Sequence, residues 1–373
     1  MLKVMSVFGT RPEAVKMAPV IRELQRRTGE VQSIVCVTGQ HREMLDQALA
    51  LFDIHPDIDL NLMQPAQRLG DLTARILTAM DDVLARVKPD WVLVQGDTTT
   101  VMAASLAAFY HRVRVGHVEA GLRSGDKHRP FPEEINRRIA DVLSDMYFAP
   151  TDAAKENLLR EGAPADKIIV TGNTVIDALL EVASRVDETL VLRIAPQLGR
   201  KRLILVTSHR RENFGQPFRE ICRAIRDLAL KYIDAHIIYP VHYNPNVNDP
   251  AHELLGGVSN ITLTEPVDYE TIVALMKRAH FILTDSGGIQ EEAPSLGKPV
   301  LVLREVTERQ EVVALGAAKL VGSDYNRIMA EASQLMDDPP AYARMAAVVN
   351  PYGDGRASRR IVDAILLQIS CGP

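Results

Sequence analysis

Acidic side chains that could transfer protons stand in three loops of the first half of the sequence. Asp97 and Glu119 each follow a short apolar run, and Glu133 and Glu134 follow the sequence Pro-Phe-Pro. Carboxyl groups on two faces of a substrate can remove and return protons. Each acid also has a structural alternative. Asp97 could be only a helix N-cap, and one of Glu133 and Glu134 is expected to serve the first turn of its helix.

Anion-binding features accompany these acids in other loops. Arg11 lies in the sequence Gly-Thr-Arg-Pro-Glu, where proline suits the first helical position and a helix start favours an anion. A surplus arginine is not needed for capping, so we favour phosphate contact over an ordinary capped helix start. His209, Arg210 and Arg211 follow another apolar run, and for these residues we also favour contact with an anion.

The strongest candidate for a phosphate site is the sequence Asp-Ser-Gly-Gly-Ile-Gln-Glu-Glu in the second half. Ser286, Gly287 and Gly288 open a predicted helix and could present backbone N–H groups to a diphosphate. The alternative is a serine N-cap followed by flexible glycines. Glu292, one turn further, could reach a ribose diol or could be a solvated helix residue.

Several kinds of cofactor and metal site are disfavoured. The sequence has neither Gly-x-Gly-x-x-Gly nor Gly-x-x-x-x-Gly-Lys-Ser/Thr, so neither bound NAD nor ATP hydrolysis is favoured. His117, Glu119 and His128 lack a second, helical pair of ligands. The sequence Asp57–Asp59 resembles the Asp-x-Asp of metal-dependent glycosyltransferases but lies outside the predicted strand-to-helix loops. We therefore predict no cofactor and no metal ion.

Composition limits the class of protein further. The 373 residues suggest two domains, and 46% hydrophobic with 24% charged residues is ordinary for a globular chain. A net charge of −5 argues against a general nucleic-acid binder. No stretch approaches the ~20 apolar residues that cross a bilayer, and the three cysteines are far apart. We predict a cytoplasmic protein that binds neither nucleic acid nor membrane.

The elements that must position these loops are short apolar strands that alternate with helices. This repetition predicts a doubly wound α/β fold, in which ligands bind at the loops after the strands. The predicted strands are 3–8, 32–38, 91–95, 113–118, 146–149, 167–170, 203–207, 235–240, 261–263, 281–284 and 300–303. The predicted helices include 14–27, 69–86, 99–110, 134–143, 176–186, 218–231 and 358–368.

A polar, weakly patterned run before strand 203–207 is the best domain boundary. We predict a first Rossmann-like domain of residues 1–171 plus the C-terminal segment 358–373. Residues 172–357 would form a second Rossmann-like domain. The two domains are expected to face each other across a central cleft.

A set of motifs spans the chain from residue 9 to residue 355. They are Gly9–Glu13, Thr38–Leu45, Gly96–Thr100, Gly116–Arg123, Pro132–Arg137, His209–Asn213, Tyr239–His242, Thr284–Pro294 and Asn350–Gly355. Some are weak individually, but together and in this order they are highly specific. With them the sequence resembles the non-hydrolysing UDP-N-acetylglucosamine 2-epimerase family.

This resemblance implies a GT-B-like fold, often dimeric, whose C-terminal helix returns to the first domain. It implies conversion of UDP-N-acetylglucosamine to UDP-N-acetylmannosamine, with the sugar on the side of the first domain and UDP on the side of the second. By motif position, it implicates Asp97, Glu119 and Glu133 in catalysis and places His209 near the nucleotide phosphates. The matching substrate or UDP positions are Arg11, Lys16, Arg137, Ser286, Gly287, Gly288, Glu292 and Arg309.

The sequence departs from the family pattern in one loop. The family usually reads Thr-Glu-Arg-Pro-Glu, but here Arg309 is followed by glutamine. Because proline fixes φ, we expect the loop that carries Arg309 to be looser. Gln40, Arg210 and His242 match a second, activating substrate site of bacterial members, although Ala66 stands where some members place an arginine.

The resemblance also implies elimination and re-addition of UDP. Expelling UDP makes the carbon-2 proton removable and leaves a glycal, to which UDP then adds back. The residues can support this route, since cations and backbone donors stabilise a departing diphosphate and carboxyl groups move protons. The acid and the base stay unassigned. The alternatives are a GT-B glycosyltransferase, a hydrolysing 2-epimerase and a UDP-sugar sensor without turnover.

Overall fold

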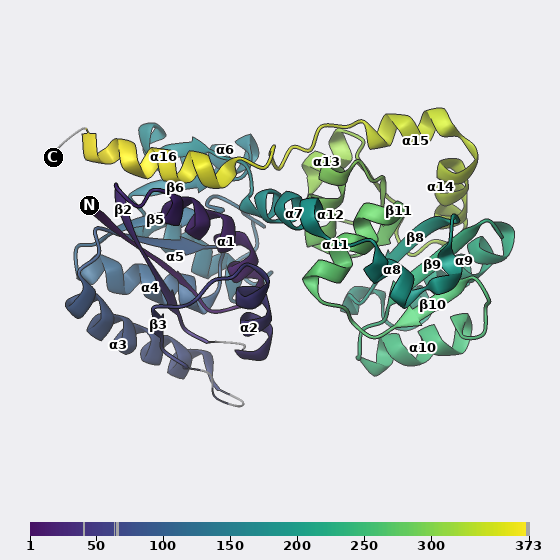
Figure 1. The fold of residues 1–373 in the computed structure, drawn as a ribbon, viewed down its shortest axis with the longest axis horizontal. Helices are drawn as coiled ribbons and strands as arrows, with labels where there is room; N and C mark the ends of the chain where they lie inside the picture. Colours follow the sequence, from purple (N-terminus) through teal and green to yellow (C-terminus); the bar gives the residue numbers. More distant parts are fainter. Residues whose placement is uncertain (40–41, 63, 65–66, 371–373) are drawn as a thin grey trace. The chain divides into compact units, whose positions relative to one another are not determined.

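Each half of the chain folds around a parallel β-sheet, as the continuously apolar strands predict (Figure 1). The computed structural model describes residues 1–39, 42–62, 64 and 67–370. The chain divides into a first unit of Met1–Ala178 with Tyr352–Pro373, and a second unit of Leu179–Pro351. The first division falls after Ala178, within the helix Thr174–Arg185. The second falls after Pro351, in the turn that precedes the last helix.

The first unit contains a seven-stranded sheet in the order β3-β2-β1-β4-β5-β6-β7. The order reverses between β1 and β4, so the loops after these strands flank the switch point where α/β sheets bind ligands. Its strands are β1 (Leu2–Phe8), β2 (Val31–Val37), β3 (Ile58–Asp59), β4 (Trp91–Gln95), β5 (Arg114–Val118), β6 (Met146–Ala149) and β7 (Ile168–Val170). Its helices are α1 (Arg11–Arg26), α2 (Arg42–Leu51), α3 (Leu69–Val87), α4 (Thr99–Tyr110), α5 (Glu133–Leu143), α6 (Asp152–Arg160) and α16 (Ala357–Ser370), with α7 (Thr174–Arg185) crossing the division.

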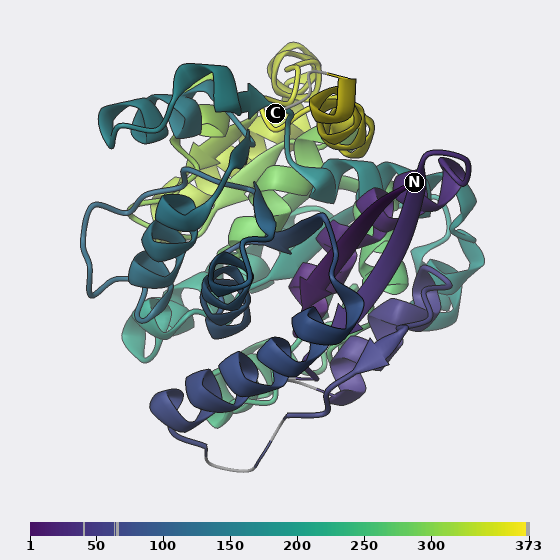
Figure 2. The same ribbon diagram turned by 90° about the vertical axis from the view of Figure 1, so that its left-hand side faces the viewer.

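The paired strands β1 and β2, purple in Figure 2, run parallel along their whole length. The short strand β3, which the sequence analysis missed, extends this sheet beyond β2. Asp57, directly before β3, binds β2, because the Asp57 Oδ2 accepts a hydrogen bond from Val35 N at 2.8 Å. The Asp-x-Asp sequence at this place therefore has a structural role.

Helix α16 belongs to the first unit although it ends the chain. It packs against α1, and Arg27 Nη2 lies 2.6 Å from Asp363 Oδ1 (yellow helix in Figure 1). Asp177 fixes the start of α16, since its Oδ1 accepts hydrogen bonds from the backbone N–H and the hydroxyl of Ser358 at 2.8 and 2.6 Å. The first unit is thus completed by the last helix of the sequence.

The segments that leave and re-enter the first unit touch each other. Asn173 N donates to Tyr352 O at 2.6 Å. Gly172 has a φ of +85°, and a Cβ there would lie 3.1 Å from both Tyr352 O and Gly353 Cα. This close approach requires glycine at position 172.

The second unit contains a six-stranded sheet in the order β10-β9-β8-β11-β12-β13, with its switch point between β8 and β11. Its strands are β8 (Arg202–Thr207), β9 (Ala235–Pro240), β10 (Ile261–Thr264), β11 (Ala279–Thr284), β12 (Val300–Val302) and the unpredicted β13 (Ala318–Leu320). Its helices are α8 (Thr189–Ile194), α9 (Gln216–Lys231), α10 (Pro245–Leu255), α11 (Tyr269–Arg278), α12 (Gly287–Glu292), α13 (Gln310–Ala314), α14 (Tyr325–Asp337) and α15 (Pro339–Ala346).

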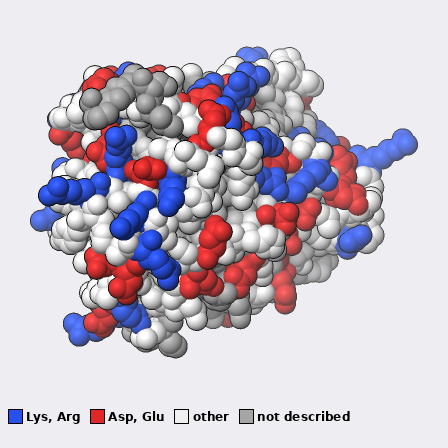
Figure 3. All heavy atoms as spheres, turned by 60° about the vertical axis from the view of Figure 1, so that its left-hand side comes forward, with Lys and Arg blue, Asp and Glu red and all other residues white. Residues whose placement is uncertain are grey.

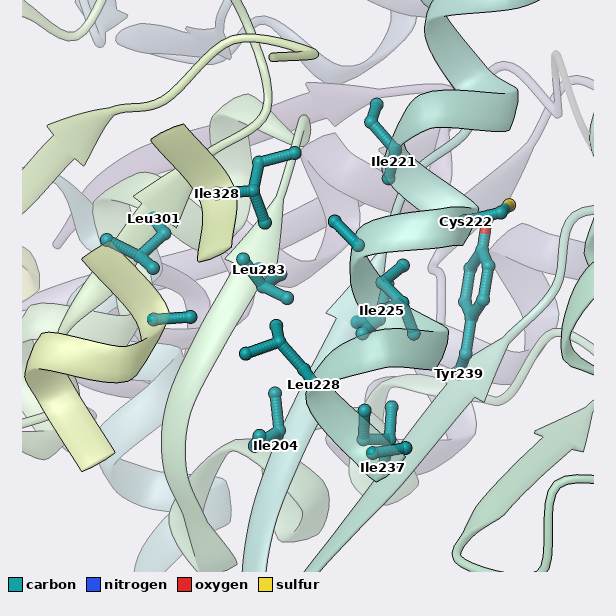
Figure 4. Packing of buried hydrophobic residues seen from close by; sticks show 14 of the residues in the cluster. Ile204, Ile221, Cys222, Ile225, Leu228, Ile237, Tyr239, Leu283, Leu301 and Ile328 are labelled. Carbon is teal, nitrogen blue, oxygen red and sulfur yellow. The ribbon is translucent and has the colours of Figure 1, made fainter. Parts of the chain in front are cut away.

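An apolar core fixes this second sheet. Ile221, Ile225 and Leu228 lie at helical spacing on α9 and pack with Ile204 and Ile237 of the strands (Figure 4). All five side chains are fully buried. Burial of one such side chain contributes about 1.5 to 3 kcal/mol, so this packing makes a large contribution to the stability of the sheet.

Among the described helices, none has the length and apolar character needed to span a bilayer. Acidic and basic side chains are interspersed on the face of the molecule in Figure 3. That face therefore carries no continuous basic tract, in keeping with the net charge of −5.

Candidate active site

The loops after β1 and β4 are joined by the carboxyl group of Glu13. Its Oε2 accepts hydrogen bonds from the backbone N–H groups of Gly9 and Thr10 at 2.9 and 2.7 Å, and its Oε1 accepts one from the Thr98 hydroxyl at 2.6 Å. Burial raises the pKa of Glu13 above its ordinary value, although these hydrogen bonds oppose the shift. Glu13 thereby fixes both loops at the switch point of the first sheet.

Arg11 is not needed to cap this helix start, because Glu13 already binds the two free N–H groups before it. The Arg11 side chain is partly exposed and forms no ion pair with any residue that the structure describes. An ordinary capped helix start therefore does not account for Arg11, and the side chain is available to an anionic ligand.

Asp97 is held by the first turns of α5. Arg137 Nη2 donates to its carboxylate, and Asn136 Nδ2 donates to its backbone carbonyl at 3.0 Å. The Asp97 side chain remains 30% exposed. Thr98 is the N-cap of α4, since its hydroxyl accepts a hydrogen bond from Val101 N. The interpretation of Asp97 as the N-cap is therefore wrong.

Glu119 is almost fully buried and accepts several hydrogen bonds. Its Oε1 lies 2.6 Å from Lys16 Nζ and 2.8 Å from Asn173 Nδ2, and Gln95 Nε2 donates to its Oε2. Its φ of +68° lies in the left-handed region. This conformation costs a residue other than glycine about 1 to 3 kcal/mol and often marks functional sites.

The structure separates the two acids that open α5. Glu134 is buried; its Oε2 accepts a hydrogen bond from Ser124 N at 3.0 Å and lies 3.6 Å from Arg137 Nη1. Glu133 is partly exposed and forms no ion pair within the described part of the chain. Glu134 is thus the structural member of the pair, and Glu133 is the one available to a substrate.

His117 is completely buried and connects β5 to the loop of Asp97. Its Nδ1 lies 2.6 Å from Asp141 Oδ1, and its Nε2 lies 2.7 Å from Gly96 O. Because both partners are acceptors, the ring must donate from both nitrogens. Burial lowers the pKa of His117, but Asp141 and the Gly96 carbonyl outweigh it, so the pKa lies above its ordinary value. Neither ring nitrogen is left to bind a metal ion.

In the second unit, a buried carboxylate joins the loops after β8 and β11. Asp285 Oδ2 accepts hydrogen bonds from Ser208 Oγ at 2.8 Å, from the backbone N–H groups of His209 and Arg210 at 2.9 Å each, and from Asn213 Nδ2 at 3.2 Å. Asp285 was not among the predicted functional residues. It fixes the backbone of the loop that carries His209.

His209 and His242 lie side by side, with ring centroids 5.7 Å apart and planes inclined by 17°. Burial lowers the pKa of His209; Asp285 opposes this shift, whereas His242 and Arg210 add to it. Arg210 forms no ion pair with the described residues. Two of the three predicted activating residues therefore adjoin His209, and the third, Gln40, lies outside the described residues.

Ser286 occupies the N-cap position of α12, but its side chain makes no capping hydrogen bond. Its hydroxyl is thus not committed to the helix, as the N-cap alternative would require. A Cβ at position 287 would lie 3.1 Å from Arg309 Cζ. Gly287 therefore allows the guanidinium group to lie against this loop, whose next residue, Gly288, is exposed.

The loop that carries Arg309, which was predicted to be looser than in family members with proline, is held by hydrogen bonds. Gln310 Nε2 donates to Thr307 O, and Thr307 Oγ1 donates to Gln290 Oε1 at 2.6 Å. Arg309 itself binds Glu291 Oε1 through Nε and Nη2 at 2.8 and 2.7 Å. The glutamine side chain thus replaces part of the restraint that proline would supply.

Glu292 is 6% exposed, so the interpretation as a solvated helix residue is wrong. The Tyr269 hydroxyl donates to Glu292 Oε1 at 2.6 Å. Burial and the neighbouring Glu292 raise the pKa of Tyr269 well above its ordinary value. Tyr269 thereby holds the carboxylate that the sequence analysis placed near a ribose.

Sequence reasoning missed most of the groups that hold the candidate residues. Gln95 and Asp285 are polar residues at the end of or just after buried strands, a signal that could have revealed them, and Asn173 lies three residues after β7. Asn136 and Tyr269 carry no such signal, because their partners are set by tertiary packing. The supporting groups are therefore less visible in the sequence than the residues they support.

The model of the family UDP-N-acetylglucosamine 2-epimerase matches residues 22–366. The UDP-N-acetylglucosamine 2-epimerase of Salmonella typhimurium (strain LT2) is 54% identical over 370 residues, which cover 98% of each chain. The GT-B-like α/β class predicted from the sequence is confirmed by the two parallel sheets and by the solved structures that this chain resembles.

Two solved structures match nearly the whole chain. The UDP-GlcNAc 2-epimerase from Neisseria meningitidis bound to UDP-GlcNAc is 52% identical, with a TM-score of 0.86 over 98% of this chain and 100% of that chain. The Methanocaldococcus jannaschii UDP-GlcNAc 2-epimerase in complex with UDP-GlcNAc and UDP is 35% identical, with a TM-score of 0.79 over 98% of this chain and 100% of that chain.

Proposed function

This chain belongs to the UDP-N-acetylglucosamine 2-epimerase family, and we propose that it interconverts UDP-N-acetylglucosamine and UDP-N-acetylmannosamine by eliminating UDP and adding it back. The observation that carries the proposal is the set of acids Asp97, Glu119 and Glu133, which follow β4, follow β5 and open α5 of the first unit. Relatives that match the whole chain bind UDP-GlcNAc and UDP, which supports the same substrate here.

The proposed route consists of two steps, an elimination of UDP and its re-addition. In the first, the bond from carbon-1 to the UDP oxygen breaks while a base takes the carbon-2 proton, which leaves 2-acetamidoglucal and UDP. In the second, an acid protonates the other face of carbon-2 and the UDP oxygen bonds to carbon-1 again. No net oxidation occurs, and the configuration at carbon-2 is inverted.

Asp97, Glu119 and Glu133 divide the proton transfers in this proposal. Asp97 follows β4, Glu119 follows β5 and Glu133 opens α5, so the three acids come from different segments, which suits the need to reach two faces of a sugar. Lys16 orients Glu119 and Arg137 orients Asp97 through the hydrogen bonds described above.

The second unit is proposed to hold UDP. The uncapped Ser286 hydroxyl, Gly287 and Gly288 would face the diphosphate, with Arg309 and His209 as cationic partners. Backbone donors and cations stabilise the charge of a leaving diphosphate, which is the main electrostatic requirement of the elimination step. Glu292, held by Tyr269, would accept hydrogen bonds from the ribose, and Arg11 is the corresponding anion-binding cation of the first unit.

One NMR experiment tests this proposal against its alternatives. The purified protein is incubated in heavy water with UDP-N-acetylglucosamine and no acceptor, and the anomeric signals are followed. We expect UDP-N-acetylmannosamine with deuterium at carbon-2. Free N-acetylmannosamine with UDP would indicate a hydrolysing enzyme. Turnover only after an acceptor is added would indicate a glycosyltransferase, and binding without carbon-2 exchange would indicate a sensor.

The homodimer stays a prediction, and one surface supports it. Helix α5 exposes the apolar side chains of Ile135, Ile139 and Val142, whereas Glu134 and Asn136 on the same helix are buried. Helix α4 packs beside it and exposes Phe109 and Tyr110. A second copy of this chain is the occupant we propose for this apolar face.

Light scattering tests the dimer directly. The wild-type protein should have twice the mass of one chain. Val142→Asp should lower that mass, because it places a charge in the proposed interface, whereas Val349→Asp, an equally exposed control in the second unit, should not. A monomeric wild type would rule out the dimer. The activating role of Gln40, Arg210 and His242, and the cytoplasmic location, also stay predictions.

A further inference from the structure

The carboxylate of Asp285 is unevenly satisfied. Its Oδ2 accepts four hydrogen bonds, whereas its Oδ1 is buried and has no hydrogen-bond partner among the residues described. Buried polar atoms nearly always have partners, and leaving one unpaired costs about 1 to 3 kcal/mol. An orphaned oxygen at the switch point of the second sheet therefore calls for a functional explanation.

His209 faces this oxygen. Its Nδ1 lies 3.6 Å from Asp285 Oδ1, which is too long for a hydrogen bond but short enough for a small side-chain rotation to close it. The backbone N–H of His209 is already fixed by Oδ2 of the same carboxylate. The His209 side chain is 44% exposed, so a ligand can reach the ring.

We propose that Asp285 is the positioning residue for His209 and that the pair closes when a diphosphate anion binds. His209 then takes up a proton from solvent, its Nδ1–H donates to Asp285 Oδ1, and its Nε2–H donates to a phosphate oxygen. No covalent bond changes. The identity of the anion as UDP rests on the proposed function, but the pairing itself does not.

The surroundings of His209 are consistent with His209 and Asp285 not being hydrogen-bonded when no anion is bound. The ionisable groups that face its ring are Asp285 from the β11 loop, His242 from the β9 loop and Arg210 from its own loop. Burial and the two basic neighbours hold the pKa of His209 below its ordinary value despite Asp285. A bound anion adds the negative charge that reverses this balance.

The substitution Asp285→Asn separates the two functions of the carboxylate. The asparagine oxygen can still accept from the four donors that fix the loop, while its NH₂ group replaces the orphaned oxygen opposite Nδ1. Ser208→Ala is the matched control, because it removes one donor to Oδ2 and leaves the charge.

The measurement is the titration of His209 by ¹H–¹⁵N NMR, with and without UDP, its signals assigned by their loss in His209→Asn. In the wild type, UDP should shift both ring nitrogens towards imidazolium values and raise the titration midpoint. In Asp285→Asn this rise should be smaller by about one pH unit or more, and UDP should bind roughly tenfold more weakly. Ser208→Ala should titrate like the wild type.

Two results would overturn the pairing: equal titration of His209 in Asp285→Asn and wild type, or an Nδ1 that stays unprotonated in the wild-type complex with UDP. The second result needs no variant, so it holds even if Asp285→Asn does not fold. If the pairing is observed but the protein forms no UDP-N-acetylmannosamine, the proposed function fails and the pairing stands.

Discussion

The two units place opposite chemistry at the same point of similar sheets. In each, a buried carboxylate joins the two loops at the switch point: Glu13 between β1 and β4, and Asp285 between β8 and β11. The loop that Glu13 holds after β4 carries the acid Asp97, whereas the loop that Asp285 holds after β8 carries His209 and Arg210. The topology fixes where a ligand can bind, and the side chains at the loops decide what is done to it.

The units also differ in how their charged groups are paired. Asp97 and Glu119 of the first unit have cationic partners in Arg137 and Lys16. In the second unit Arg210 has no acidic partner in the described chain, and His209 stands 3.6 Å from one. Asp97 and Glu119 are thus held in place by cations, whereas Arg210 and His209 carry no such close pairing. Arg309 of the second unit differs from these two, because it pairs with Glu291.

The largest expected effect tests whether proton transfer belongs to the first unit. Asp97→Asn should lower kcat by about 100- to 10,000-fold, the usual contribution of a general acid or base. UDP affinity, measured by calorimetry, should change by less than about twofold because Asp97 would not contact the nucleotide. Near-normal turnover would remove Asp97 from the mechanism. A large loss of UDP binding would contradict the assignment of proton transfer to the first unit and UDP binding to the second.

A second pair of substitutions sharpens the comparison within α5. Glu133→Gln should lower kcat by about 100-fold with little change in melting temperature. Glu134→Gln should lower the free energy of unfolding by roughly 1 to 3 kcal/mol, because it disturbs the hydrogen bond that the buried Glu134 carboxylate accepts from Ser124 N. Steady-state kinetics and thermal denaturation of both variants check this. The opposite pattern would show that the exposed acid is structural.

On the second unit, Arg309→Gln should weaken UDP binding by roughly 10- to 100-fold, the loss expected for one charged hydrogen bond. Arg359→Gln is a control, since this exposed arginine of α16 pairs only loosely with Asp363. Calorimetry with UDP gives both affinities, and a melting curve reports any effect of leaving Glu291 without its partner. Unchanged UDP binding in Arg309→Gln would exclude Arg309 from the phosphate site.

The smallest effect contrasts one histidine from each unit. The folded-state pKa of His117 is raised, so its stabilising contribution is present below about pH 6.5 and is lost as the pH rises through that folded-state pKa. Relative to His117→Gln, the wild type should therefore become less stable above about pH 6.5, by roughly 1.4 kcal/mol per unit of pKa shift.

His209 should show the opposite sign, because its folded-state pKa is lowered. Relative to His209→Asn, the wild type should lose stability as the pH falls below about 6.5. Urea denaturation of the three proteins between pH 5 and pH 9 measures both trends. Parallel curves for wild type and His117→Gln would show that Asp141 does not hold the buried imidazole in its charged form.

The fold was largely readable from the sequence because each central strand is a continuous apolar run between helical segments. The strand β4 has the predicted bounds, and the helices α1 and α5 begin within a few residues of their predicted starts. The strand β3 escaped notice, since two residues show no periodicity and only pairing with β2 defines them.

The sequence predicted which positions contribute to the candidate site but not the role of each residue there. Glu133 and Glu134 are equally suited to a helix start, and only the burial of Glu134 separates them. Asp97 and Thr98 are both good N-caps, and only backbone geometry selects Thr98. Asp285 lies in a recognised motif, but its contacts with residues more than 70 positions away depend on strand order.

The return of α16 to the first unit has a consequence for synthesis on the ribosome. The first unit cannot close until its final helix emerges, yet the whole of Leu179–Pro351 is translated in between. At about 5 to 20 residues per second, this delay lasts roughly 10 to 35 seconds. During that time the surface of α1 that α16 will cover stays exposed on the nascent chain, so chaperone binding is expected there before the polypeptide is released.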